Sequence, residues 1–92
     1  MNIVHNIGEG FFIEKEVNGT TKVLAELTYL KKGNILVANH TFVSEELRGQ
    51  GIAENLFNEI VKYARDNNFK IDATCSYVVK KLDNEKYNDI KI

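Results

Sequence analysis

The sequence predicts a mixed α+β fold in which an antiparallel β meander precedes a central amphipathic helix, a further strand and a short C-terminal helix. Three observations predict it. Two β-like runs flank an Asn-Gly dipeptide at residues 18 and 19, apolar residues recur at helical spacing over 52–64, and an alternating run follows that helix. Because strand, helix and strand follow in series, the last strand is expected to lie parallel to the third through a right-handed crossover.

The meander is predicted from two turns. Residues 11–17 and 22–30 are β-like runs on either side of the Asn-Gly dipeptide, which favours a tight hairpin turn. A second turn at residues 31–34 leads into residues 35–43, where an apolar opening followed by alternating polar groups predicts a third strand. No element is assigned to the residues before Phe11.

The central helix is predicted from an apolar face with polar residues opposite it. The apolar positions are Ile52, Ala53, Leu56, Phe57, Ile60, Val61 and Ala64. Asn67-Asn68 supplies a stop, and residues 69–75 alternate as a final strand. Ser76 can cap a short helix over Tyr77–Leu82, and the polar tail after it is expected to be loosely packed.

Composition limits the possible functions. A chain of 92 residues with 43% hydrophobic and 27% charged residues is expected to form one domain, residues 1–92, because no proline, repeat or linker marks a boundary. Its 12 basic and 13 acidic residues offer no broad cationic surface, so no nucleic acid partner is expected. Without a membrane-length apolar run or a leader pattern, we expect a cytoplasmic protein with no membrane partner. We also expect a monomer. A single cysteine, Cys75, excludes an internal disulfide, and no Cys/His cluster predicts a metal site.

The segment from Val43 to Ala53 joins the third strand to the central helix through Arg48, Gly49 and Gly51. A helix start leaves about four backbone N–H groups without partners, and glycines let an anion approach them closely. The segment therefore predicts a phosphate cradle. It is not a P-loop, because no Lys-Ser/Thr pair follows Gly51, and the Glu at position 54 argues against a dinucleotide fingerprint.

The spacing Arg48-x-x-Gly51-x-Ala53 resembles the coenzyme A pyrophosphate motif of the GNAT N-acetyltransferase superfamily. Residues 39–43 (Asn-His-Thr-Phe-Val) and 73–78 (Ala-Thr-Cys-Ser-Tyr-Val) resemble the small YjdJ-type branch of that superfamily. The resemblance implies a GNAT-like fold and transfer of an acetyl group from acetyl-CoA to a small-molecule or peptide amine. It covers the chain from Leu24 to the tail, and Asn39 stands where relatives often carry an acidic residue.

The predicted site residues come from the phosphate cradle and from the segments that resemble the family. Coenzyme A would contact Val43, Arg48, Gly49, Gln50, Gly51, Ile52, Ala53, Ser76 and Tyr77. In the cradle, the backbone amides supply most of the binding and Arg48 contacts phosphate. A backbone N–H of the third strand would stabilise the oxyanion, and the Tyr77 hydroxyl is a candidate proton donor to the departing thiolate, although packing against the sheet is its other interpretation.

Two residues are candidates for the chemistry. His40 suits a general base, because an imidazole can remove the proton from an amine that is cationic at neutral pH. A strand histidine can equally be a hydrogen-bonded core residue, in alternation with Leu36, Ala38 and Phe42. Cys75, just before the short helix, is either an acyl relay, a polar contact for the thioester or a small buried side chain. The resemblance favours a catalytic cysteine.

A second hypothesis comes from a different class of protein. The chain lacks the acceptor-binding elements of larger relatives, so it could be a non-catalytic acyl-CoA sensor or a protein interaction module. The acceptor cannot be identified from the sequence.

Overall fold

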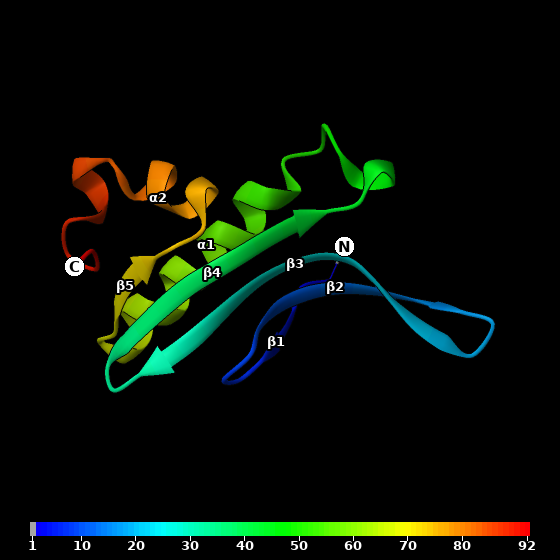
Figure 1. Cartoon of the computed structure of the whole chain (residues 1–92), viewed down its shortest axis with the longest axis horizontal. Coiled ribbons are helices and arrows are strands. Elements are labelled where there is room, and N and C mark those ends of the chain that lie inside the picture. The colour runs from blue at the N-terminus through cyan, green and yellow to red at the C-terminus, as the bar shows by residue number, and fades with distance from the viewer. Residues whose placement is uncertain (1) are drawn as a thin grey trace.

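The computed structural model describes residues 2–92, which form one five-stranded sheet in the order β1-β2-β3-β4-β5 (Figure 1). Neighbouring strands are antiparallel, except that β4 and β5 are parallel. The strands are β1 (Val4–Asn6), β2 (Gly10–Val17), β3 (Thr20–Lys32), β4 (Ile35–Val43) and β5 (Lys70–Ala73). The predicted α+β class, the antiparallel meander and the parallel last strand are confirmed.

Local sequence explains the turns and helix ends. Asn18 and Gly19 both have positive φ, 52° and 79°, as a two-residue hairpin turn requires. Helix α1 (Ile52–Asn67) ends at Asn68, which adopts the left-handed conformation and donates its N–H to the carbonyl of Ala64. Helix α2 (Ser76–Leu82) follows β5, and single-turn helices cover Glu45–Leu47 and Glu85–Tyr87.

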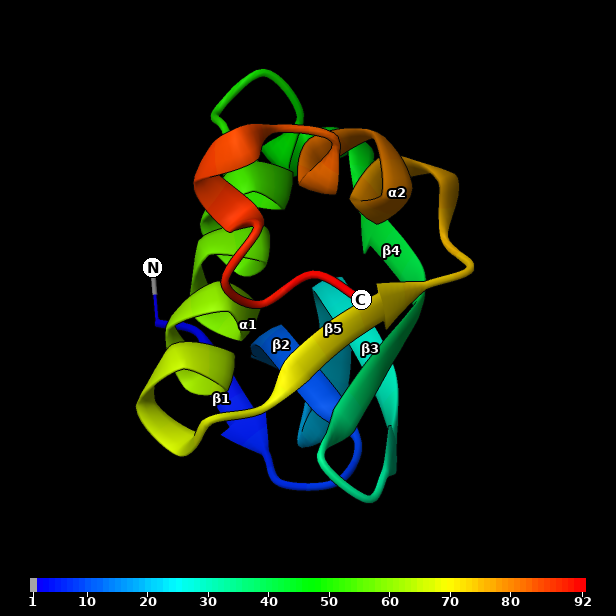
Figure 2. The ribbon, with the colours of Figure 1, turned by 90° about the vertical axis from the view of Figure 1, so that its left-hand side faces the viewer.

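Two features differ from the sequence prediction. The first is β1, a strand of three residues that pairs with β2. The second is the tail, which is not loosely packed. Tyr87 and Ile90 are buried, and the N–H of Ile71 in β5 donates to the Ile90 carbonyl. Figure 2 shows this C-terminal segment beside β5, where Lys91 forms a parallel bridge with Ile71. Isolated apolar residues in a polar stretch carry no periodic pattern, so their burial depends on β5.

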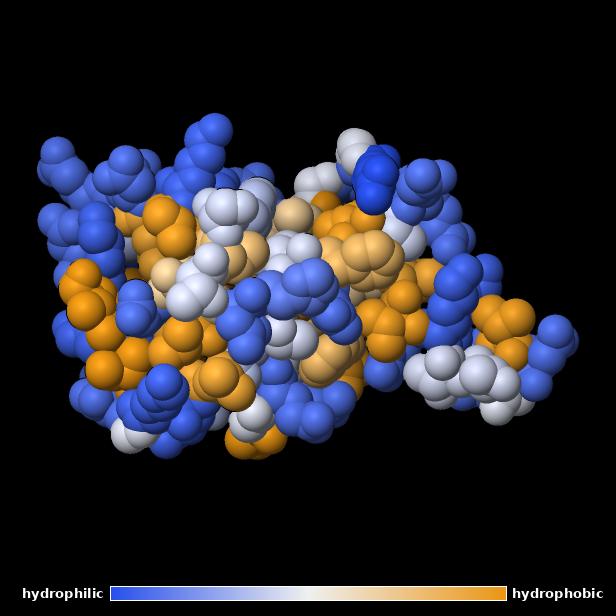
Figure 3. Space-filling model, viewed as in Figure 1, coloured by the Kyte–Doolittle hydropathy of each residue, from blue (hydrophilic) through white to orange (hydrophobic). Residues whose placement is uncertain are grey.

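One face of the sheet carries no helix. In Figure 1, β4 crosses in front of α1, so the viewer faces the uncovered side, and Figure 3 shows hydrophobic and hydrophilic patches mixed on it. Strand register places Phe12, Glu26 and Phe42 side by side across β2, β3 and β4. Phe42 is 40% exposed. We call this uncovered side the open face.

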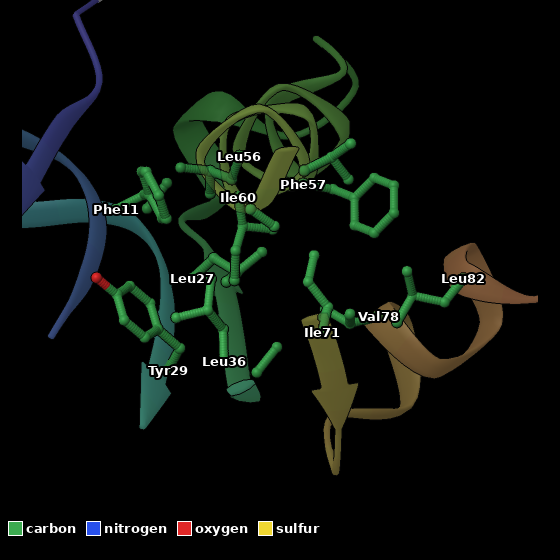
Figure 4. Close-up of a cluster of buried hydrophobic side chains, with 14 of the residues drawn as sticks. Phe11, Leu27, Tyr29, Leu36, Leu56, Phe57, Ile60, Ile71, Val78 and Leu82 are labelled. Carbon is green, nitrogen blue, oxygen red and sulfur yellow. The ribbon is translucent and has the colours of Figure 1, made fainter. Parts of the chain in front are cut away.

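The core lies on the opposite side, where both helices pack. Figure 4 shows Phe57 of α1 turned toward Val78 and Leu82 of α2, with Ile71 of β5 between the helices and the rest of the sheet. Phe57, Val78 and Ile71 are each at most 1% exposed. One continuous core therefore holds α1, α2 and the end of β5 together, and this fixes where the loop before α1 lies relative to α2.

Among the helices in residues 2–92, none has the length and apolar character needed to cross a membrane.

Candidate functional site

A β-bulge in β4 decides which way its side chains point. His40 pairs with Thr28 and Ala38 pairs with Tyr29, so Asn39 is an extra residue without a partner on β3. Before the bulge, Leu36 and Ala38 face the core; after it, His40 is exposed on the other side. The expected alternation of His40 with Leu36 and Ala38 is therefore wrong, because the extra residue reverses the pattern.

Beyond the bulge, β4 and β5 separate. Their pairing ends at Ala38 and Ala73, and the carbonyl of Ala38 accepts the N–H groups of both Thr74 and Cys75, at 2.9 and 3.2 Å. On the other edge of β4, the Ser44 N–H donates to Leu24. Alternation along an antiparallel ladder then turns the N–H groups of residues 41 and 43 away from β3, toward the gap that β5 leaves.

The start of α1 lies beside this gap and has no cap. Its N-cap is Gly51, in the left-handed conformation at φ 71°, and no side chain among residues 2–92 caps it. Gly49 is also left-handed, at φ 82°. A Cβ at either glycine would meet no atom within 4 Å, so the space above this backbone is open. Within residues 2–92, the N–H groups of Gly49 and of residues 51–54 donate no backbone hydrogen bond. These groups suit an anion.

A hollow of about 240 Å³ opens over this helix start. Its lining includes seven of the nine residues predicted to contact coenzyme A: Val43, Arg48, Gly49, Gly51, Ile52, Ala53 and Tyr77; Leu47 and Glu54 complete it. The structure thus brings together β4, the loop, α1 and α2 around one cavity. Gln50 and Ser76 do not line it. The side-chain amide of Gln50 instead donates to the Glu46 carbonyl at 3.3 Å. The prediction that Ser76 caps α2 is wrong, because Cys75 is the N-cap and Ser76 is the first residue of the helix.

Comparison with known proteins identifies the family. The family model of the GCN5-related N-acetyl-transferases matches residues 11–90. The chain belongs to the GCN5-related N-acetyltransferase family. A protein from Staphylococcus aureus, a proposed GCN5-like N-acetyltransferase whose solution structure was determined by NMR, is similar to it at 36% identity with a TM-score of 0.76. The alignment covers 99% of this chain and 87% of that one. No curated protein sequence matches the chain.

The predicted acetyltransferase function is therefore confirmed, and the chain is an acyltransferase. Enzymes of this family use acetyl-CoA as the co-substrate and act on small amines.

Arg48 of this acetyltransferase connects the loop to β4. Its Nε donates to the Val43 carbonyl at 3.2 Å, and the residue is otherwise exposed. That bond uses one of the five N–H donors of a guanidinium. The contact directs the Arg48 side chain back toward the end of β4, where Val43 lines the cavity.

Cys75 lies at the end of the β4–β5 gap, as the N-cap residue of α2. Its thiol is 3.3 Å from the Thr41 hydroxyl. Burial raises the pKa of this thiol, but hydrogen bonds from the Thr41 hydroxyl and from the N–H groups of Val78, Tyr77 and Thr41 outweigh burial, so the pKa lies below its usual value. The arrangement stabilises a thiolate.

Tyr77 has the opposite tendency. Burial raises the pKa of its phenol above the ordinary value, with the nearby Lys81 opposing the rise. The Tyr77 hydroxyl therefore keeps its proton at neutral pH and can act as a donor toward the cavity that it lines.

Within residues 2–92 no hydrogen bond joins His40 to Cys75, because Thr41, the residue after His40, turns to the opposite side of β4 and contacts Cys75. His40 instead pairs with Glu26 on β3, with 3.3 Å between Nε2 and the carboxylate oxygen. Its side chain is 56% exposed and that of Glu26 is 24% exposed. The core interpretation of His40 is wrong, since it faces solvent on the open face. The carboxylate partner of His40 on this face is Glu26.

Sequence reasoning missed Glu26 and Thr41 as members of the site. Glu26 sits in a predicted strand, and only the β3–β4 register brings it next to His40. The turn at residues 31–34 predicts that these two strands pair, but it does not predict the bulge, which shifts the register of the pairing by one residue. Thr41 contacts Cys75 across 34 positions of sequence, and no local pattern predicts such a contact.

Proposed function

We propose that this acetyltransferase transfers an acetyl group from acetyl-CoA to a primary amine that approaches from the open face. The observation that carries the proposal is the uncapped start of α1, with two left-handed glycines under an open hollow beside the β4–β5 gap. The N–H groups of residues 49–53 would hold the diphosphate, and Arg48 would contact it from the side. The free space above Gly49 and Gly51 supports this fit.

The gap between β4 and β5 suits the extended arm of the co-substrate. The Val43 N–H is turned toward the gap by the strand alternation described above and is the proposed donor to the acetyl oxygen. The Thr41 N–H already interacts with Cys75. Acetyl-CoA, when bound, supplies the acetyl group as an activated thioester.

His40 and Glu26 are the proposed base pair on the acceptor side. Glu26 faces Nε2 of His40, which leaves Nδ1 of the imidazole for the amine. His40 would take the proton from the amine as the amine nitrogen bonds to the acetyl carbon and the carbon–sulfur bond breaks. Glu26 would stabilise the resulting imidazolium, and the Tyr77 hydroxyl would donate a proton to the departing sulfur.

Cys75 allows an alternative route in which its thiolate accepts the acetyl group before the amine does. Its lowered pKa supports nucleophilicity. The two routes differ in one measurable respect: Cys75→Ala retains substantial turnover if the amine attacks directly and almost none if Cys75 is acetylated first. We propose direct attack, because His40 lies on the acceptor side and pairs with Glu26, whereas Cys75 is hydrogen-bonded to Thr41.

The test is a continuous assay of thiol release from acetyl-CoA with a panel of alkylamines and lysine peptides. Wild type is expected to release thiol above the spontaneous rate, and His40→Gln is expected to lower kcat about 10²- to 10⁴-fold while leaving the KM for acetyl-CoA unchanged. His5→Gln, at the other histidine, is the matched control. Coenzyme A binding without turnover on any amine would contradict the proposal and favour a sensor.

We also propose membership of the small YjdJ-type branch, with residues 1–92 acting as one domain. The resemblance of residues 39–43 and 73–78 to that branch, the alignment of 99% of this chain with 87% of the Staphylococcus aureus relative, and the single core support this.

A further inference from the structure

Glu54 occupies the third position of α1, three residues after the N-cap Gly51. A glutamate at this position commonly reaches back to the N-cap N–H and forms a capping box. Here the Glu54 carboxylate instead accepts a hydrogen bond from the Lys81 ammonium of α2, at 2.9 Å. The N–H groups that Glu54 would otherwise occupy belong to the same helix start that is proposed to bind the diphosphate.

Lys81 is well placed to hold the Glu54 carboxylate. Its side chain is 31% exposed, and its ammonium lies 5.7 Å from the centroid of the Phe57 ring in α1. The hydrogen bond with Lys81 lowers the pKa of Glu54, and the same contact raises the pKa of Lys81, so both groups are charged at neutral pH. The pair joins α1 to α2 at the wall of the cavity that Glu54 and Tyr77 both line.

We propose that Lys81 is a positioning residue for the diphosphate site: it keeps the Glu54 carboxylate away from the first N–H groups of α1 and neutralises its charge. The inference rests on the proposed function of that site. Without Lys81, Glu54 is an anion tethered within reach of the N–H groups that an anionic ligand needs. It would then compete with the diphosphate by hydrogen bonding and by charge repulsion.

This role makes a prediction that direct contact between Lys81 and a phosphate does not make. If Lys81 acts through Glu54, its removal harms binding only while Glu54 carries a charge. Removing that charge should then restore binding, even though Lys81 is still missing. If Lys81 contacts the ligand itself, the loss persists whatever residue stands at position 54.

The experiment is a calorimetric titration with coenzyme A on wild type, Lys81→Met, Lys81→Arg, Glu54→Gln and the double variant K81M/E54Q. Lys81→Met keeps the apolar stem over Phe57 and is expected to weaken binding about 10-fold or more, the effect of one charged hydrogen bond. Lys81→Arg should stay near wild type. The double variant should bind within about 3-fold of Glu54→Gln, as expected for two residues that act as one unit.

Two further measurements distinguish a positioning role of Lys81 from a general effect of surface charge or of folding stability. Lys80→Met removes the neighbouring charge on α2, for which the described residues include no ion pair, and should leave coenzyme A affinity within about 2-fold of wild type, as screened surface charges do. In turnover assays, Lys81→Met should raise the KM for acetyl-CoA and leave kcat unchanged.

An affinity of Lys81→Met equal to wild type, or a double variant as weak as Lys81→Met, would overturn the inference while leaving the diphosphate site in place. A wild type that does not bind coenzyme A would overturn the proposed function and the inference with it.

Discussion

Gly51→Val should weaken coenzyme A binding, while its loss of folding stability should be no larger than that of a comparable glycine variant far from the site. Gly51 is the N-cap of α1, at φ 71°, and an added Cβ would enter the open space where the diphosphate is proposed to lie. Gly33, in the turn between β3 and β4, provides a matched control. It has a similar φ of 59° and equally free surroundings, but it precedes β4, whereas the cradle follows the other end of that strand.

The expected magnitudes follow from the geometry. A non-glycine residue in the left-handed region costs about 1–2 kcal/mol, and both variants carry this cost, so Gly33→Val and Gly51→Val should lose similar free energy of unfolding. Only Gly51→Val should also lose a charge-assisted hydrogen bond to the ligand, worth about 1.5–3 kcal/mol or roughly 10- to 150-fold in Kd.

The assay is calorimetric titration with coenzyme A, combined with urea unfolding of the same samples. Gly33→Val should bind like wild type. Equal affinity in Gly51→Val and wild type would refute the cradle, and an equal loss of affinity in both glycine variants would show that backbone strain, rather than steric exclusion, causes the effect.

Three further predictions concern residues around and away from the site. Thr41→Val should slow alkylation of Cys75 by iodoacetamide at pH 7 but not at pH 10, because the hydroxyl that helps to lower the thiol pKa is lost. A variant that reacts at the wild-type rate at both pH values would contradict this. Leu56→Ala, at a fully buried position, should lower the free energy of unfolding in urea by about 2–5 kcal/mol, and a loss below 1 kcal/mol would argue against the described core. His5, stacked on Phe11 and bonded to the Tyr29 hydroxyl at 2.7 Å, has its pKa lowered by burial, against the opposing charge of Glu59. Below about pH 6.5 the unfolded chain therefore binds more protons than the folded chain does, so the melting temperature should fall as the pH is lowered from about 6.5. His5→Gln should show a shallower fall, and an identical slope would remove His5 from the account.

Local patterns in the sequence were sufficient for much of the fold. The spacing of Leu56, Phe57 and Ile60 predicts the buried side of α1, and Asn18-Gly19 predicts the hairpin, because both signals lie within a few residues. The order of strand, helix and strand predicts the parallel pairing of β5. The position of the two glycines at the start of α1 could be predicted for the same reason, since the loop and the helix are contiguous.

The remaining features depend on contacts between distant segments. The bulge at Asn39 arises from the pairing of β4 with β3, and it alone determines that His40 faces the open side next to Glu26. Burial of Ile90 needs β5 beside it. The pair formed by Lys81 and Glu54 spans 27 positions. No periodicity or turn motif contains such information, so these parts of the site required the three-dimensional structure.

The central claim is that the backbone amides at the start of α1 hold the diphosphate of coenzyme A. The most direct measurement is a titration of the ¹⁵N-labelled protein with coenzyme A, followed by amide NMR shifts. The account predicts that the largest shifts fall on the amides of residues 49–53 and that they saturate together. Saturable binding that leaves these amides unmoved, with the largest shifts elsewhere in the chain, would contradict it.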